Sequence, residues 1–293
     1  MNFIYLVIIY GFPRRNCARS STGQSVRLRT ERLGVRLPPG AVVFKQIANP
    51  RIKKIIKFIS EDIEKFFFNR TVYFVILFFP LLILLNSFYW MIINYKKTYI
   101  DLIVKEHYPV ESISVIVILV SIIIGIRFVF LMYRRKIEKF KIIFVGLLVL
   151  GLIFVGLEEV SWGQWFFYFN SPEYFKETNL QRETNIHNLK NLHVIFEYIR
   201  VFIGVGGLIS IFLNNTRTFK YISSPFVLIL FFVVIIIFSG LDVYNYYLTD
   251  QRVLSNVGSV WWFLKLNMEI IELMIGFSAL IFLYSNYRSL KYN

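Results

Sequence analysis

The chain has 293 residues, of which 56% are hydrophobic and 17% charged, and its formal net charge is +15. A soluble domain carries about 25% charged residues, so this composition argues against a water-soluble globule and favours an all-α, polytopic membrane helix bundle. One cysteine excludes an internal disulfide framework and a cysteine-rich zinc site. Because lysine and arginine flank membrane spans, the positive charge is not a sign of nucleic-acid binding, and we expect no nucleic-acid partner.

Residues 1–44 differ from the rest of the chain in their basic residues. They hold seven arginines and no lysine, whereas the remainder holds sixteen lysines and ten arginines. The stretch 20–41 resembles the conceptual translation of a tRNA gene, which predicts a non-native extension whose true start lies between Val43 and Ile52. A targeting segment and a basic RNA-binding arm are the alternatives, although no positively charged region precedes the short apolar run at 2–12.

Residues 45–70 are predicted to lie on the membrane surface. Between 51 and 69, isoleucines and phenylalanines recur at helical spacing, and four lysines with Asp62 occupy the other face. This pattern is typical of an amphipathic interfacial helix.

Six apolar segments follow, and together they predict a membrane domain at 71–284 with a short tail at 285–293. A hydrocarbon core of about 30 Å requires roughly 20 helical residues. The segments that satisfy this length are 71–93, 112–133, 142–169, 192–213, 224–248 and 260–284.

The distribution of cations predicts the orientation of these spans. With both termini in the cytoplasm, the inner segments hold fifteen lysines and arginines and the outer loops hold seven. Basic residues accumulate on the cytoplasmic side, so we expect a multi-pass protein of the cell membrane with both termini in the cytoplasm and loop 170–191 outside it.

Carboxylates from four of the spans are predicted to lie at one depth, towards the outer side. Ionisable groups within spans usually face a bundle interior or a water-filled cavity, so a common polar pocket is expected. The six are Glu158, Glu159, Glu197, Asp242, Glu269 and Glu272. For Glu197, the simpler interpretation is an ion pair with Arg200, three residues further along the same helix.

The loop between the third and fourth spans is rich in amides, acids and histidine. Glu183 with His187, and His193 with Glu197, are i,i+4 pairs that share a face wherever the chain is helical. Imidazole and carboxylate together suit a divalent metal, so these four residues are candidate metal ligands. The alternative is a polar network that satisfies helix ends and loop backbone.

Two segments of the sequence resemble the pattern of a known family. They are Glu158-Glu159-Val160-Ser161-Trp162-Gly163-Gln164 and Asn179-Leu180-Gln181-Arg182-Glu183-Thr184-Asn185-Ile186-His187-Asn188. They resemble a family of uncharacterised bacterial polytopic membrane proteins with the pattern E-E-[IV]-S-W-G-Q, then N-x-Q-x-E-x-N-[LI]-H-N. The similarity covers about 32 residues, and Trp165 stands where the family usually has arginine. The resemblance implies a location in a bacterial inner membrane, and it favours Glu158, Glu159 and His187 as a functional group of residues.

Three classes of function remain open from the sequence. The first is an intramembrane hydrolase or transferase on a lipid-type substrate, in which Glu158, Glu159 and His187 act as acid, base or metal ligands and Glu183 orients His187. The expected substrate-binding residues are Trp162, Gln164, Gln181, Asn185, Asn188, Asp242, Glu269 and Glu272. The second is an ion- or proton-coupled transporter, and the third is a non-catalytic scaffold. No H-E-x-x-H or G-x-S-x-G motif decides among them.

Overall fold

The fold is that of a computed structural model, which describes residues 59–60, 62–63, 70–93, 109–179, 182–214, 218–249 and 268–292. The predicted extension at 1–44, most of the predicted surface helix and Gln181 lie outside these residues. Within them, six helices are long and apolar enough to cross a membrane, which confirms the all-α polytopic bundle. They are α3 (Arg70–Ile93), α4 (Pro109–Arg134), α5 (Lys139–Glu159), α8 (His193–Phe212), α9 (Ile229–Thr249) and α11 (Met268–Tyr292).

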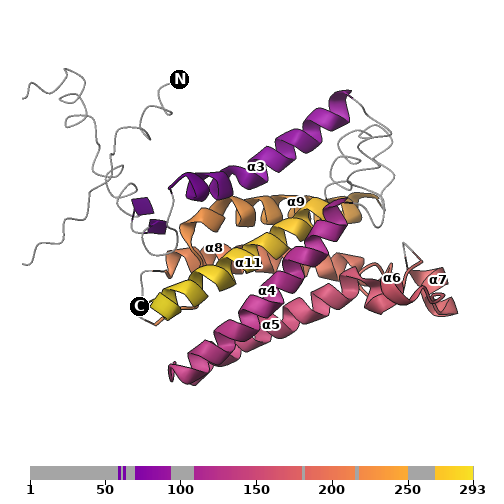
Figure 1. Cartoon of the computed structure of the whole chain (residues 1–293). Coiled ribbons are helices and arrows are strands. Elements are labelled where there is room, and N and C mark those ends of the chain that lie inside the picture. Colours follow the sequence, from indigo (N-terminus) through magenta and orange to yellow (C-terminus); the bar gives the residue numbers. More distant parts are fainter. Residues whose placement is uncertain are drawn as a thin grey trace, which may run out of the picture. The chain divides into compact units, whose positions relative to one another are not determined.

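Helix α4 packs between α5 and α11, and α9 packs against α8, α11 and α3 (Figure 1). The contacts bury apolar side chains such as Phe128, Phe231 and Met274. Serines are buried in the same helices, among them Ser121 of α4, whose hydroxyl donates to the carbonyl of Val117. Small side chains and hydroxyls of this kind let membrane helices approach closely.

Large apolar side chains also cover the outside of the spans. Leu85 is 65% exposed, Leu147 is 63% exposed and Phe202 is 73% exposed. A water-soluble monomer rarely shows contiguous apolar surface of this extent, whereas lipid tails cover it without loss. The exposed faces therefore agree with the apolar composition in indicating a multi-pass membrane protein.

The third span is shorter than the sequence predicts. The apolar run to residue 169 indicates one long helix, but α5 ends at Glu159, and the short helices η3 (Ser161–Gly163) and α6 (Gln164–Phe167) follow a change of direction. Aromatic residues after the break hide it from hydropathy. At the other end of the chain, α11 continues to Tyr292, so the predicted tail is largely helical.

Asp62 is buried, which corrects its predicted place on a solvent-facing polar surface. Its side chain is 3% exposed and accepts hydrogen bonds from the Tyr73 hydroxyl (3.1 Å), the Asn214 amide (3.3 Å) and the Phe226 backbone N–H (3.0 Å). The carboxylate therefore joins the segment before α3 to the end of α8 and to η4 (Phe226–Leu228) at the start of α9.

Glycine allows α8 and α9 to pack closely. A Cβ atom on Gly207 would lie 2.3 Å from the ring of Phe232, and one on Gly204 would lie 2.5 Å from Ile236. The neighbouring Gly206 faces open space. Two of the three glycines thus permit a helix contact that no larger residue would allow without displacement.

Candidate functional site

A sharp turn follows α5 and positions the first part of the site. Ser161, Trp162 and Gly163 have φ values of 47°, 55° and 93°, so three successive residues adopt left-handed backbone. For the two non-glycine residues this conformation costs roughly 1–2 kcal/mol each, and it persists only where surrounding contacts hold it. The turn directs Ser161 and Trp162 back towards the end of α5.

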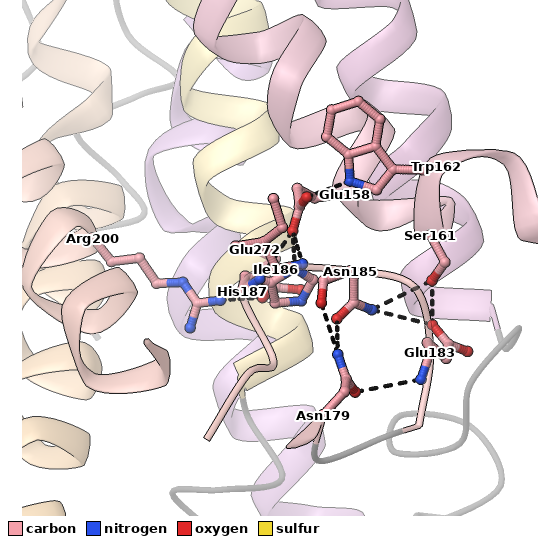
Figure 2. Close-up of polar contacts among 10 residues, drawn as sticks. All are labelled: Glu158, Ser161, Trp162, Asn179, Glu183, Asn185, Ile186, His187, Arg200 and Glu272. Carbon is pink, nitrogen blue, oxygen red and sulfur yellow. Dashed lines mark hydrogen bonds and ion pairs between the residues drawn. The ribbon is translucent and has the colours of Figure 1, made fainter. Parts of the chain in front are cut away.

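Glu158 is the centre of the contacts that hold this turn to the loop before α8 (Figure 2). Its Oε1 accepts the indole N–H of Trp162. Its Oε2 accepts the backbone N–H groups of Ile186 (2.6 Å) and His187 (2.9 Å) and lies 3.2 Å from Nδ1 of His187. The side chain of Glu158 is 4% exposed. One buried carboxylate thus fixes both the backbone and the ring of His187.

A second group of polar contacts braces the same loop. The Ser161 hydroxyl donates to the Glu183 carboxylate, and the Asn185 amide donates to both, at 3.3 Å and 3.2 Å. The Asn179 amide donates to the backbone carbonyl of Asn185 (2.8 Å) and to its side-chain oxygen (2.7 Å). The backbone of Asn179 also pairs with Leu189 in an isolated antiparallel bridge.

Gln164 is a further brace. Its amide donates to the Ser171 hydroxyl (3.1 Å), and its oxygen accepts the backbone N–H of Thr184 (3.0 Å). Several polar residues of segments 158–164 and 179–188 therefore bond to one another. The predicted network that satisfies the loop backbone is present, and it occupies Gln164 and Asn185, which the sequence assigns to substrate.

A cavity of about 80 Å³ lies beside this network. Its polar lining consists of Glu158, Glu159, His187, Arg200 and Glu272. The three residues predicted to be catalytic therefore face the same space. The rest of the lining is apolar and comes from α4, α5, α8 and α11, with Ile118, Leu152, Phe154, Val155, Phe196, Ile199, Ile203, Ile275 and Gly276.

Arg200 connects the cavity to a second set of acids. Its guanidinium pairs with Glu197 on its own helix and with Glu272 on α11, and its side chain is 11% exposed. The predicted Glu197–Arg200 pair is confirmed. Arg200 and Glu272 are 72 residues apart in sequence, and their contact joins α8 to α11.

The predicted metal ligands separate into two places. His193 and Glu197 lie with Asp242 of α9, whereas Glu183 and His187 belong to the loop contacts around Ser161 and Glu158. The loop that carries Glu183 and His187 is not helical, so the i,i+4 spacing does not put them on one face. Glu183 contacts Ser161 and Asn185 rather than orienting His187, a role that Glu158 takes.

The other expected substrate residues lie in several settings. Glu272 lines the cavity. Glu269 is in the first turn of α11, Asn188 is half-buried in the loop, and Trp162 is 43% exposed with its indole N–H on Glu158. None of these three is among the lining residues of the cavity.

No family model, curated protein or solved structure matches the chain.

Ser161, Asn179 and Arg200 take part in the site without having been assigned to it from sequence. The sequence nevertheless contains an indication of each. Ser161 and Asn179 belong to segments 158–164 and 179–188, and Arg200 lies one helical turn from Glu197, at the depth predicted for the acids. The bridge from Arg200 to Glu272 has no sequence signal, because it depends on which faces of α8 and α11 meet.

Proposed function

We propose that this protein is an intramembrane hydrolase or transferase whose substrate is an ester of a membrane lipid, with His187 as general acid and base and Glu158 as the group that positions it. The observation that carries the proposal is the pairing of Nδ1 of His187 with the buried Glu158 at the wall of a cavity.

The arrangement of His187 suits proton transfer. The Glu158 carboxylate accepts the proton of Nδ1, which leaves Nε2 as the basic nitrogen, and within the described residues no hydrogen bond reaches Nε2. Nε2 would take the proton of an attacking hydroxyl or water and return it to the leaving oxygen of the ester. A carboxylate that orients an imidazole and stabilises its charged form is a recurrent solution for this chemistry.

The walls of the cavity indicate what kind of substrate reaches it. Phe154, Ile199 and Ile203 line the cavity and are 38%, 46% and 41% exposed, so the cavity opens among side chains that face the lipid. A volume of about 80 Å³ accepts a reacting group with a few waters and excludes acyl tails. The tails of a lipid substrate would remain in the bilayer while its ester enters.

The charged lining gives the cavity a means of binding a polar headgroup. Arg200 lines the cavity, is held in place by Glu197 and Glu272, and offers N–H donors to a carbonyl oxygen of the ester. Glu159 is 7% exposed beside it and is the second acid available for proton transfer. Gln164 and Asn185 act on the loop and position His187.

The membrane and the sidedness belong to the same proposal. The excess of lysine and arginine in one set of loops supports a cytoplasmic location of both termini, with loop 170–191 on the outer side. The resemblance of segments 158–164 and 179–188 supports a bacterial inner membrane. His187 would then act at the outer leaflet. The partners would be the bilayer and its lipids, with no nucleic acid.

The test is the composition of membrane lipids in cells that express the chain. His187→Asn and Glu158→Gln should each lower the conversion of the substrate lipid by about 10²- to 10⁴-fold, since general acid–base catalysis contributes that much. Lipid extracts compared by mass spectrometry would show the substrate accumulating and the product disappearing.

Glu177→Gln is the matched control, because Glu177 is an exposed acid of helix α7 (Glu173–Thr178) outside the cavity. It should leave the lipid profile unchanged. If all three variants keep the wild-type lipid profile at equal protein level, the enzyme is excluded. Proton-driven flux in liposomes would then favour the transporter, and its absence would favour the scaffold.

A further inference from the structure

Three side chains near the start of α8 and on α9 form a compact group outside the cavity. One donor atom from each of His193, Glu197 and Asp242 lies within 4.8 Å of the others. Nε2 of His193 is 3.3 Å from Oδ2 of Asp242. None of the three lines the cavity that holds His187, so this group is a separate feature.

The spacing fits a small divalent cation. Bonds of about 2.0–2.1 Å to imidazole nitrogen and carboxylate oxygen, at tetrahedral angles, separate neighbouring ligand atoms by about 3.3 Å. The measured distance from His193 to Asp242 has this value. A third ligand within 4.8 Å reaches the same centre after a small change of rotamer.

Glu197 has a carboxylate oxygen without a hydrogen-bond partner among the residues that the structure describes. Its Oε1 pairs with Arg200, while Oε2 is buried and accepts no hydrogen bond from any residue that the structure describes. The side chain is 1% exposed. A buried charged oxygen without a donor is costly, and a bound cation would remove that cost.

The charge around the group also favours a cation. Arg200 is shared between Glu197 and Glu272, so its single positive charge does not balance both. Asp242 adds a further negative charge on α9, with His193 as its neighbour. A divalent ion between Glu197 and Asp242 would neutralise the excess negative charge.

Access is compatible with exchange of the ion. The side chains of His193 and Asp242 are 29% and 17% exposed, so the group is open on one side and closed at Glu197. Three protein ligands with one position left for water or another ligand is the usual form of an accessible zinc site.

We propose that His193, Glu197 and Asp242 bind one divalent cation of the zinc class, which ties α8 to α9. Imidazole nitrogen with two carboxylates selects Zn²⁺ over Mg²⁺ and Ca²⁺, which prefer oxygen alone. The proposal does not depend on the enzymatic role of His187. The metal set expected from the sequence contained two of these ligands and missed Asp242.

The test is Zn²⁺ binding by the full chain in nanodiscs after treatment with a chelator. Competition with a chromophoric chelator should show one tight site per chain, unaffected by excess Mg²⁺. His193→Asn and Asp242→Asn should each weaken binding by at least about 100-fold, because even residues that only support a ligand cost 10- to 100-fold. Co²⁺ should give the visible absorption of a tetrahedral nitrogen–oxygen site in the wild type and lose it in both variants.

His187→Asn is the matched histidine control and should bind Zn²⁺ as the wild type does. Asp242→Asn keeps the proposal testable if changing the α8 residues disturbs folding. Absence of stoichiometric Zn²⁺ in the folded wild type would overturn it and leave a simple His193–Asp242 ion pair. Loss of binding in His187→Asn with retention in His193→Asn would overturn it as well, since the metal would then lie in the cavity.

Discussion

Asp62 and Glu158 are two buried carboxylates that contact the chain after and before α8, respectively. They differ in the groups that surround them. Asp62 bonds to Asn214, which follows α8, and Glu158 bonds to His187 in the loop that precedes it. Both accept backbone N–H groups, from Phe226 in the first case and from Ile186 and His187 in the second.

The difference lies in the neighbours of each carboxylate. Asp62 is 3% exposed, has a phenol, an amide and a backbone N–H among its partners, and is not among the residues that line the cavity. Glu158 contacts an imidazole at the wall of a cavity. A buried acid is therefore not by itself a sign of function. The sign is an acid that orients a titratable group towards open space.

The largest expected effect would separate the two acids by activity. Glu158→Gln should lower lipid turnover per folded molecule by about 10²- to 10⁴-fold, because His187 loses the charge that holds its tautomer. Asp62→Asn should leave that rate unchanged. Turnover of extracted lipids by purified chain, normalised to the folded fraction, measures both, and equal losses in the two variants would contradict the comparison.

Replacing Asp62 should lower the stability of the fold. Asp62→Ala removes the acceptor of three donors and should destabilise the fold by about 3 kcal/mol, since each buried donor left unpaired costs about 1–3 kcal/mol and water relieves part of this. Unfolding in mixed micelles of increasing SDS content measures the change. Asn214→Ala removes the contact with Asp62 and also the acceptor of the Ser223 hydroxyl (2.8 Å), so it should cost about 1–3 kcal/mol. A loss below 1 kcal/mol in Asp62→Ala would show that the contact is dispensable.

The contact between α8 and α9 lies between the two ends and can be loosened by one methyl group. Gly207→Ala places a Cβ atom 2.3 Å from the Phe232 ring and should destabilise the fold by about 1–3 kcal/mol. Gly206→Ala is the matched control, because its Cβ would meet nothing within 4 Å, and it should be neutral or stabilising by about 0.5–1 kcal/mol. SDS unfolding of both variants measures the pair, and equal behaviour would show that α8 does not pack closely there.

A smaller loss of turnover than that of Glu158→Gln is expected at Trp162. Trp162→Phe removes one hydrogen bond to Glu158 and leaves the contacts on Oε2 in place. Because the lost bond has a charged acceptor, the free energy of activation should rise by about 1–2 kcal/mol. Turnover should fall roughly tenfold. Steady-state turnover measures it. A loss as large as that of His187→Asn would mean that the indole itself contacts the substrate.

Much of the site was predictable because its residues are close in sequence. Glu158, Trp162, Asn179, Glu183, Asn185 and His187 fall within two short segments of the sequence. The division of labour among them was not predictable. Glu183 contacts Ser161 instead of His187, because the loop is irregular and three left-handed residues change the direction of the chain after α5.

Hydropathy had the same limit in the fold. Six spans follow from apolar length alone, since each must satisfy its own backbone in lipid. The end of α5 at Glu159 does not follow, because the aromatic residues beyond it are as apolar as those before it. The sequence pattern predicts that Asp62 belongs to a charged face. Only the packing of Tyr73, Asn214 and Phe226 around it shows that it is buried.

Composition and periodicity by themselves determined that this chain is a helical membrane protein and which polar residues lie near the helix ends, because lipid allows few other structures for so apolar a sequence. Tertiary structure decided which of those residues meet. Arg200 joins Glu272, and Asp242 joins His193 and Glu197, only because particular faces of α8, α9 and α11 are turned towards one another. That choice depends on the shapes of many apolar side chains packing at once, and no local pattern in the sequence records it.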